Sequence, residues 1–121
     1  RAAARIKKGQ QDKLYLGNLD ARRDWGHAKD YVRAMVLSLR AGGEYVVATG
    51  QSRAVRDLCF AAFWHVGLDW TRYVETDESY MRPAEVPDLK GDPAKIMGLG
   101  WVPKYSFEEM IQEMMECAMT N

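Results

Sequence analysis

Two short stretches of this sequence carry side chains suited to binding phosphate. In the first, Arg22 and Arg23 lie between a short apolar run and Asp24, a pattern that predicts a strand, a turn and the start of a helix. Guanidinium groups are planar donors that bind phosphate oxygens in pairs, and the free N–H groups of a helix start favour the same anion. The residues are equally compatible with a solvated loop, so both interpretations stay open at this point.

The second stretch is RPAEV, which runs from Arg82 to Val86. Its proline disfavours a helix at Arg82, so we expect a loop or strand end that presents Arg82 and Glu85 in a defined way. The arginine could bind a phosphate while the carboxylate three residues later accepts from a sugar hydroxyl. The two side chains could also form an ion pair with each other.

Other reactive side chains give weaker signals. Neither His27 nor His65 is surrounded by a convincing set of metal ligands, so we predict no metal site. Cys59 and Cys117 lie on or beside apolar helical faces, and we interpret both as small core residues rather than a disulfide or metal pair.

Strands and helices alternate in the first half of the chain. Leu14 to Gly17 is a predicted strand, and Tyr45 to Ala48 reads as a parallel strand covered on both faces. Asp24 is expected to cap the first long helix and Ser52 the second. This alternation indicates an α/β fold. The expected core faces are Trp25, Ala28, Val32, Met35, Val36 and Leu39 in the first helix, and Val55, Leu58, Cys59, Ala62, Phe63 and Val66 in the second.

Three further helices complete the expected fold. The segment from Ala2 ends at Gly9, and Asp92 followed by proline opens a short helix. Ser106 and Glu109 form a capping box for a final, methionine-rich helix. The fold class is therefore α/β, with about five helices and a few short, partly parallel strands.

Composition restricts the protein class. The 121 residues are 47% hydrophobic, enough for one domain with a core, and they include neither a membrane-length apolar run nor a leader pattern. We therefore expect no membrane association and a cytoplasmic location. The net charge is zero, but residues 1–60 hold 12 basic and 6 acidic side chains, against 5 and 11 in residues 61–121. A basic half could attract a nucleotide or a nucleic acid. The sequence contains no nucleic-acid-binding motif, so we do not favour a nucleic acid.

Five motifs together resemble one family, the GDP-mannose 4,6-dehydratases of the extended short-chain dehydrogenase/reductase superfamily. They fall in family order along nearly the whole chain, and they resemble the C-terminal third of these enzymes. The motifs are the stretch from Leu14 to Val32 with its RDWG core, YVVATG from Tyr45, RPAEV from Arg82, Gly91-Asp92-Pro93, and Leu99-Gly100-Trp101 with Pro103-Lys104.

The resemblance implies a site for a GDP-sugar. By their places in the motifs, Arg23, Arg82 and Glu85 would contact the GDP moiety, and Leu16 and Gly17 would line the nucleotide pocket. The implied reaction converts GDP-mannose to GDP-4-keto-6-deoxymannose, with NADP taking a hydride from the sugar C4 and returning it to C6. The binding partner implied for this chain is GDP-mannose or GDP.

The resemblance also implies that parts of such an enzyme lie outside these 121 residues. No glycine set fits a dinucleotide loop, no tyrosine has a lysine four positions later, and the other catalytic residues of the family would precede Arg1. We therefore expect a fragment, a single lobe over residues 1–121, without a cofactor site or catalysis of its own. It would pair with an N-terminal Rossmann domain or self-associate. The alternative is a freestanding remnant that serves as a binding or oligomerisation module.

One departure from the family pattern lies after Gly50. There the chain reads QSRAVR from Gln51 to Arg56, where the family usually has His-Ser-Val-Arg.

Overall fold

The structure is a computed structural model that describes all residues 1–121. It confirms the expected α/β class, with five α-helices and a few short strands. The helices are α1 (Ala2–Lys7), α2 (Ala28–Ala41), α3 (Val55–His65), α4 (Ala94–Met97) and α5 (Phe107–Thr120), with 3₁₀ turns η1 (Trp70–Arg72) and η2 (Glu78–Tyr80). The strands are β1 (Leu14–Leu16), β2 (Arg22–Arg23), β3 (Arg53–Ala54), β4 (Val74–Thr76) and β5 (Asp88–Leu89).

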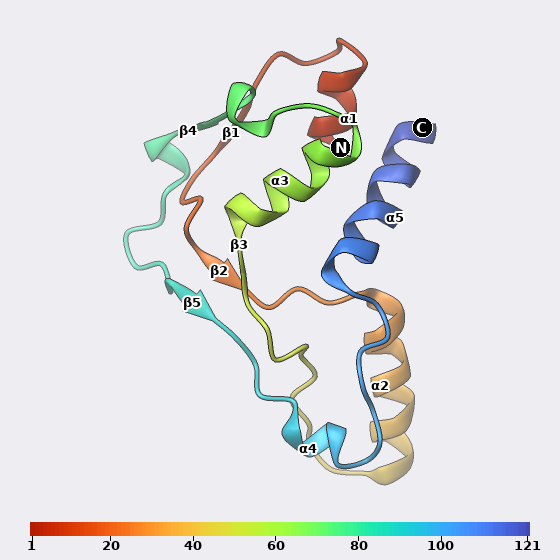
Figure 1. The fold of residues 1–121 in the computed structure, drawn as a ribbon. Coiled ribbons are helices and arrows are strands. Elements are labelled where there is room, and N and C mark those ends of the chain that lie inside the picture. Colours follow the sequence, from red (N-terminus) through yellow and green to blue (C-terminus); the bar gives the residue numbers. More distant parts are fainter.

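The strands form two small sheets. Strand β1 pairs in parallel with β4. Strand β2 lies at the centre of the second sheet, antiparallel to β3 and parallel to β5. This sheet lies between two groups of helices, one formed by α1, α3 and α5 and the other by α2 and α4 (Figure 1). Segments far apart in the sequence therefore meet at β2.

The larger core lies between α3 and α5 and is closed by α1. Phe63 on α3 and Ile111 and Met115 on α5 are buried there, as their helical spacing predicts. Ser106 accepts a hydrogen bond from the Glu109 backbone at 3.1 Å, which confirms the predicted start of α5. Gly67, with a φ of +73°, takes the left-handed conformation that follows α3.

A second, smaller core joins α2 to α4. Ala34, Ile96 and Trp101 are buried in it. The Trp101 indole donates to the Asp30 carbonyl oxygen at 2.9 Å, so the aromatic ring is held against the first turn of α2.

Asp30 is the buried acid of this second core. Its carboxylate accepts from the backbone amides of Lys104 and Tyr105, at 3.0 and 3.1 Å, and from the Arg33 guanidinium at 2.6 Å. Burial by itself would raise the pKa of Asp30, but these hydrogen bonds outweigh it and hold that pKa below its ordinary value. The charged carboxylate thus fixes the segment before α5 onto α2.

The prediction for the start and the buried face of α2 was wrong. The helix begins at Ala28, and the His27 ring, not Asp24, accepts the capping hydrogen bond from Lys29 at 3.0 Å. The face expected in the core is exposed, with Leu39 at 86%. Helix α2 instead packs through Ala34 and its neighbours, since α4 and Trp101 lie on that side. The exposed apolar residues are Val32, Met35, Val36 and Leu39.

The segment Tyr45 to Ala48 is not the expected strand. It lies between α2 and β3, and its backbone N–H and C=O groups make no backbone hydrogen bonds. Gly91 packs closely against it, since a Cβ there would lie 2.4 Å from the Ala48 Cβ. The segment has contacts on one side but no strand beside it.

Two smaller expectations also differ from the structure. Helix α3 begins at Val55, with Ala54 rather than Ser52 at its N-cap position. The Ala54 amide donates a hydrogen bond to the Asp57 carboxylate at 2.9 Å. Of the two cysteines, Cys59 is buried as expected whereas Cys117 is exposed. None of the helices has both the length and the apolar character that crossing a membrane requires.

Candidate functional site

The two adjacent arginines of β2 make contacts with different segments. Arg22 donates from Nε to Ser52 Oγ at 3.2 Å and from Nη2 to the Ser52 carbonyl at 2.9 Å. Arg23 reaches the loop before β5, where Nη1 donates to the Val86 carbonyl at 2.8 Å. Successive strand residues point to opposite faces, so only Arg23 lies on the face of the RPAEV loop.

Arg23 and Glu85 form an ion pair across this face. Arg23 Nη2 lies 3.3 Å from Glu85 Oε1, and both side chains are largely shielded, with 25% and 21% exposed. Glu85 therefore pairs with Arg23 rather than with Arg82, and the idea that the two RPAEV side chains pair with each other is wrong. A guanidinium with three hydrogen bonds is held in place, and its remaining N–H groups can still donate.

Arg82 lies near this pair along the chain but forms no hydrogen bond or ion pair with either member of it. It is exposed, next to the turn that contains Pro83 and Ala84, and it takes part in none of the seven ion pairs. Three residues span at most about 10 Å, so Arg82 stays within reach of an anion bound beside Glu85.

Leu16 and Gly17 lie against the segment that leads to Arg82. The Leu16 carbonyl accepts from the Asp77 amide at 2.8 Å, which extends the parallel pairing of β1 with β4. A Cβ on Gly17 would lie 2.6 Å from the Tyr80 carbonyl oxygen. Only glycine allows η2 to approach the end of β1 this closely, because the atom it meets belongs to the backbone.

Asp24, the residue after the two arginines, connects three segments of the chain through hydrogen bonds to its carboxylate. Its carboxylate accepts from the Thr49 amide at 3.0 Å, from the Thr49 hydroxyl at 2.5 Å and from the Gly50 amide at 2.9 Å. A longer contact of 3.3 Å reaches the Gly91 amide. This carboxylate therefore fixes the end of β2 against the chain before β3 and the chain after β5.

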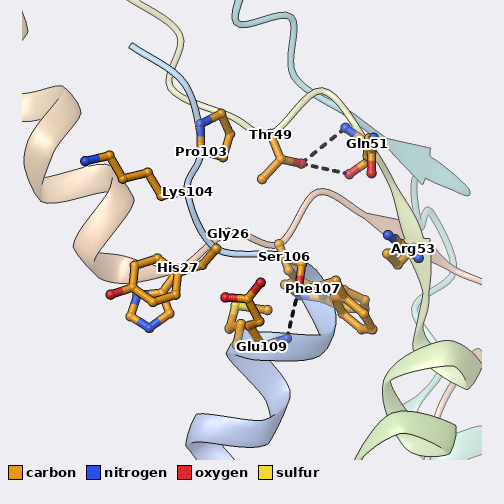
Figure 2. A pocket seen from close by; sticks show the side chains of 13 residues that line it. Gly26, His27, Thr49, Gln51, Arg53, Pro103, Lys104, Ser106, Phe107 and Glu109 are labelled. Carbon is orange, nitrogen blue, oxygen red and sulfur yellow. Dashed lines mark hydrogen bonds between the residues drawn. The ribbon is translucent and has the colours of Figure 1, made fainter.

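A polar cavity of about 460 Å³ opens between the start of α2, the chain before α3 and the start of α5. Figure 2 shows Gln51 and Arg53 on one side of it, with His27 and Lys104 on the other. Ser106 also lines it, so the walls offer cations, amides and hydroxyls. Glu109 adds a carboxylate to the lining, which therefore suits a polar ligand.

The His27 side of the cavity is braced against α5. His27 Nε2 lies 2.7 Å from Glu113 Oε2, and the His27 ring stacks on Tyr105 with centroids 4.0 Å apart. The hydrogen bond from His27, with the nearby Lys29 ammonium, lowers the pKa of the Glu113 carboxyl. Because its other ring nitrogen caps α2, this histidine has no free nitrogen for a ligand.

These residues do not form a cofactor site of the dinucleotide-binding type. Such a site needs a strand that passes through a glycine-rich turn into a helix. Gly17 follows β1, but the chain continues from there into β2, and β3 enters α3 directly through Ala54. The strands of this chain therefore lack the glycine-rich turn that holds a dinucleotide in a site of that type.

Sequence reasoning found the ion-pairing residues of this face but missed two others. Asp24 was expected to cap a helix, and its position gives no sign that it binds a turn far along the chain. Arg53 was noted only as a departure from the family pattern. The one available signal was spacing: Gln51 and Arg53 follow Gly50 and lie two positions apart, as side chains on the same face of a strand do.

Comparisons with known proteins identify the family of this chain. The family model described as GDP-mannose 4,6 dehydratase matches residues 1–114. GDP-mannose 4,6 dehydratase 1 of Arabidopsis thaliana is 49% identical over 119 residues, covering 96% of this chain and 33% of the relative. The Homo sapiens GDP-mannose 4,6 dehydratase is 40% identical over 134 residues, covering 94% and 36%. The chain thus spans about a third of the length of these relatives, corresponding to their C-terminal part.

Solved structures show the same fold within larger proteins. RMD from Pseudomonas aeruginosa, complexed with NADPH, matches with a TM-score of 0.86 and 25% identity, covering 98% of this chain and 40% of that chain. The dTDP-glucose 4,6-dehydratase of Bacillus anthracis, in complex with NAD, matches in fold with a TM-score of 0.84 and 21% identity, covering 99% and 38%. The fold is that of the C-terminal lobe of extended short-chain dehydrogenase/reductases, and the chain belongs to the GDP-mannose 4,6-dehydratase family.

Proposed function

We propose that this chain binds the GDP part of GDP-mannose, as the nucleotide-sugar-binding portion of a GDP-mannose 4,6-dehydratase. The observation that carries the proposal is the Arg23–Glu85 pair, because it unites two motifs on one face of a sheet. A fixed guanidinium beside a carboxylate offers a donor for a phosphate and an acceptor for a hydroxyl within a few ångströms.

Each predicted site residue has a distinct role in this proposal. Arg23 donates to the diphosphate, and Arg82 swings in from its exposed turn to a second phosphate oxygen. Glu85 keeps one carboxylate oxygen for a ribose hydroxyl while the other faces Arg23. Leu16 and Gly17 form the wall beside the nucleotide, where η2 packs against the end of β1.

We assign binding and orientation, but not chemistry, to these residues. The conversion of GDP-mannose to GDP-4-keto-6-deoxymannose uses NADP, which supplies the hydride chemistry when bound to the whole enzyme. The present chain would hold the GDP end of the substrate so that the sugar extends toward a separate catalytic domain. We therefore propose that residues 1–121 form one lobe of a cytoplasmic enzyme and are inactive by themselves.

The partner that we propose is an N-terminal Rossmann domain of the same enzyme family. Two surfaces support this proposal. The segment Tyr45 to Ala48 has unused backbone donors and acceptors, and an adjacent strand would pair with them. Helix α2 exposes an apolar face that includes Leu39, which a second layer of structure would cover.

The same two surfaces favour a second candidate, a freestanding module that self-associates. Light scattering and binding of an apolar dye separate it from an isolated, non-associating lobe. We expect oligomers or dye binding for the wild-type chain, and a loss of both after Leu39→Glu and Met35→Glu. A monodisperse wild-type monomer that binds no dye would contradict the interpretation that these two surfaces need a partner.

Titration calorimetry with GDP, GDP-mannose and ADP tests the binding proposal. We expect the chain to prefer the guanine ligands and to lose affinity by about tenfold or more after Arg23→Ala or Arg82→Ala. The matched control is Arg56→Ala, since Arg56 pairs with Asp20 on another part of the surface. A folded chain that binds none of the three ligands at millimolar concentration would refute the proposal.

A further inference from the structure

A second arginine lies directly opposite Arg23 on the neighbouring strand β3. In the antiparallel register, Arg23 pairs with Arg53 and Arg22 pairs with Ala54. Residues directly opposite each other point to the same face, with Cβ atoms about 5 Å apart. The Arg22 guanidinium bonds Ser52, two residues before Ala54, which agrees with this alternation. Arg53 therefore shares the face that carries Arg23 and Glu85.

Arg53 is only weakly neutralised within the chain. Its Nη1 atom lies 3.8 Å from Glu108 Oε1, and the Glu108 side chain is 69% exposed. Such a long, solvated ion pair contributes little free energy, so the guanidinium can exchange it for a ligand at small cost. The side chain is steadied meanwhile by the Phe107 ring, whose centroid lies 5.1 Å from its Cζ atom.

Two like charges directly opposite each other destabilise a strand pair. Glu85 offsets the Arg23 charge at 3.3 Å, but no carboxylate lies as close to Arg53. A dianion placed between the two guanidiniums would relieve this repulsion and accept hydrogen bonds from both. The arrangement thus favours an anion with several oxygens over a neutral ligand.

The polar cavity adjoins Arg53, and its lining also includes the Glu109 carboxylate. Arg53 lines it together with Gln51, and Lys104 lies on the opposite side, without an ion pair (Figure 2). Arg53 consequently connects the Arg23–Glu85 face to a hollow large enough for further parts of a polar ligand.

We propose that Arg53 binds the diphosphate of the nucleotide sugar from β3, beside Arg23 on β2. The two phosphates of a diphosphate are joined through one oxygen, so two arginines at paired positions of neighbouring strands can each engage one of them. In binding, Arg53 turns from Glu108 toward the second phosphate. This inference rests on the proposed function, because it assigns one more residue to the same site.

Comparison of GDP with GMP tests this role, since GMP lacks the second phosphate. By calorimetry, we expect Arg53→Gln to lower the affinity for GDP about tenfold and the affinity for GMP much less. Arg23→Ala is expected to weaken both ligands. Arg56→Gln removes the same charge from an exposed position on α3, and we expect it to change the ratio of GDP to GMP affinity by less than about twofold.

A conservative variant keeps the test informative if Arg53→Gln unfolds the chain, which circular dichroism reports. Arg53→Lys retains the charge but not the planar pair of donors, and we expect it to recover part of the preference for GDP over GMP. If wild-type chain binds GDP but neither Arg53 variant changes that preference, the role of Arg53 is refuted and the proposed function stands. If folded wild-type chain binds no GDP, both proposals fail.

Discussion

Removal of the Asp24 carboxylate is expected to loosen the sheet that holds Arg23. In the structure this carboxylate bonds the amides of Thr49 and Gly50, the Thr49 hydroxyl and, more distantly, the Gly91 amide. Asp24→Ala leaves these donors without their acceptor, and solvent reaches them only in part.

The expected loss follows from the geometry of these bonds. Hydrogen bonds to a charged acceptor contribute about 1.5 kcal/mol or more each, and partial exposure lowers that figure. Counting the bonds to Thr49 and Gly50 and little from the 3.3 Å contact, Asp24→Ala should lower the free energy of unfolding by about 3 kcal/mol. Asp24→Asn keeps one acceptor oxygen, so about half of that loss is expected.

Urea unfolding followed by circular dichroism measures this difference. With a slope of about 1–3 kcal/mol per molar urea, Asp24→Ala should lower the midpoint by about 1–3 M. The control is Asp20→Ala, whose exposed ion pair with Arg56 should contribute less than about 1 kcal/mol. Equal midpoints for the two alanine variants would refute the reasoning, because they would show that the Asp24 contacts add nothing to stability.

Three further predictions concern other parts of the fold. The lowered pKa of Asp30 means that its stabilisation is present above the ordinary value of 3.8 and is lost as the pH falls through the lower, folded value; Asp30→Asn should remove this acid dependence in unfolding measured between pH 2 and 6. Gly17→Ala should displace the turn at Tyr80, lowering the thermal midpoint and the affinity for GDP in calorimetry, whereas unchanged values would show that the close approach is dispensable. Ser106→Ala should remove the capping bond to the Glu109 amide and lower the free energy of unfolding by about 1 kcal/mol in urea, with Ser106→Asp retaining most of it.

The parts of the fold that could be predicted from the sequence are those specified by neighbouring residues. The start of α5 depends on Ser106 and residues within the next turn, and its buried stripe depends on helical spacing. The predicted start is confirmed. Of the expected stripe, Ile111 and Met115 are buried as predicted, whereas Met114, also expected there, is exposed. The α/β class likewise follows from the alternation of apolar runs, which each strand and helix carries in its own sequence.

Features that depend on distant residues were harder to predict. The Asp24 carboxylate has the right type and place for a helix cap, but the amides at Thr49 and Gly50 bind it instead. Tyr45 to Ala48 has the composition of a buried strand and lacks a strand beside it. A pattern indicates what a segment can pair with, while the pairing itself depends on which other segments are present.

The same limit applies to the candidate site. Arg23, Arg82 and Glu85 were selected from their types and motifs, yet the sequence could not show that Glu85 pairs with Arg23. That contact arises because β5 lies parallel to β2, and this register is a property of the assembled sheet. Arg53 reaches the same face through the antiparallel pairing of β3, which no local signal specifies.

The pairing of β2 with β5 also affects the order of folding. Each strand contributes only two residues, and the paired residues Arg22 and Asp88 are separated by more than half of the chain. Closing this long loop lowers the chain entropy, and only two pairs of residues are gained in return. Helices α2 and α3 can form from local contacts, whereas the Arg23–Glu85 pair must wait for that closure. We expect β5 to open at lower free energy than the α3–α5 core, and amide hydrogen exchange should be faster at Leu89 than at Phe63. Binding of a ligand across β2 and β5 would slow that exchange at Leu89 and so report on the site from its backbone.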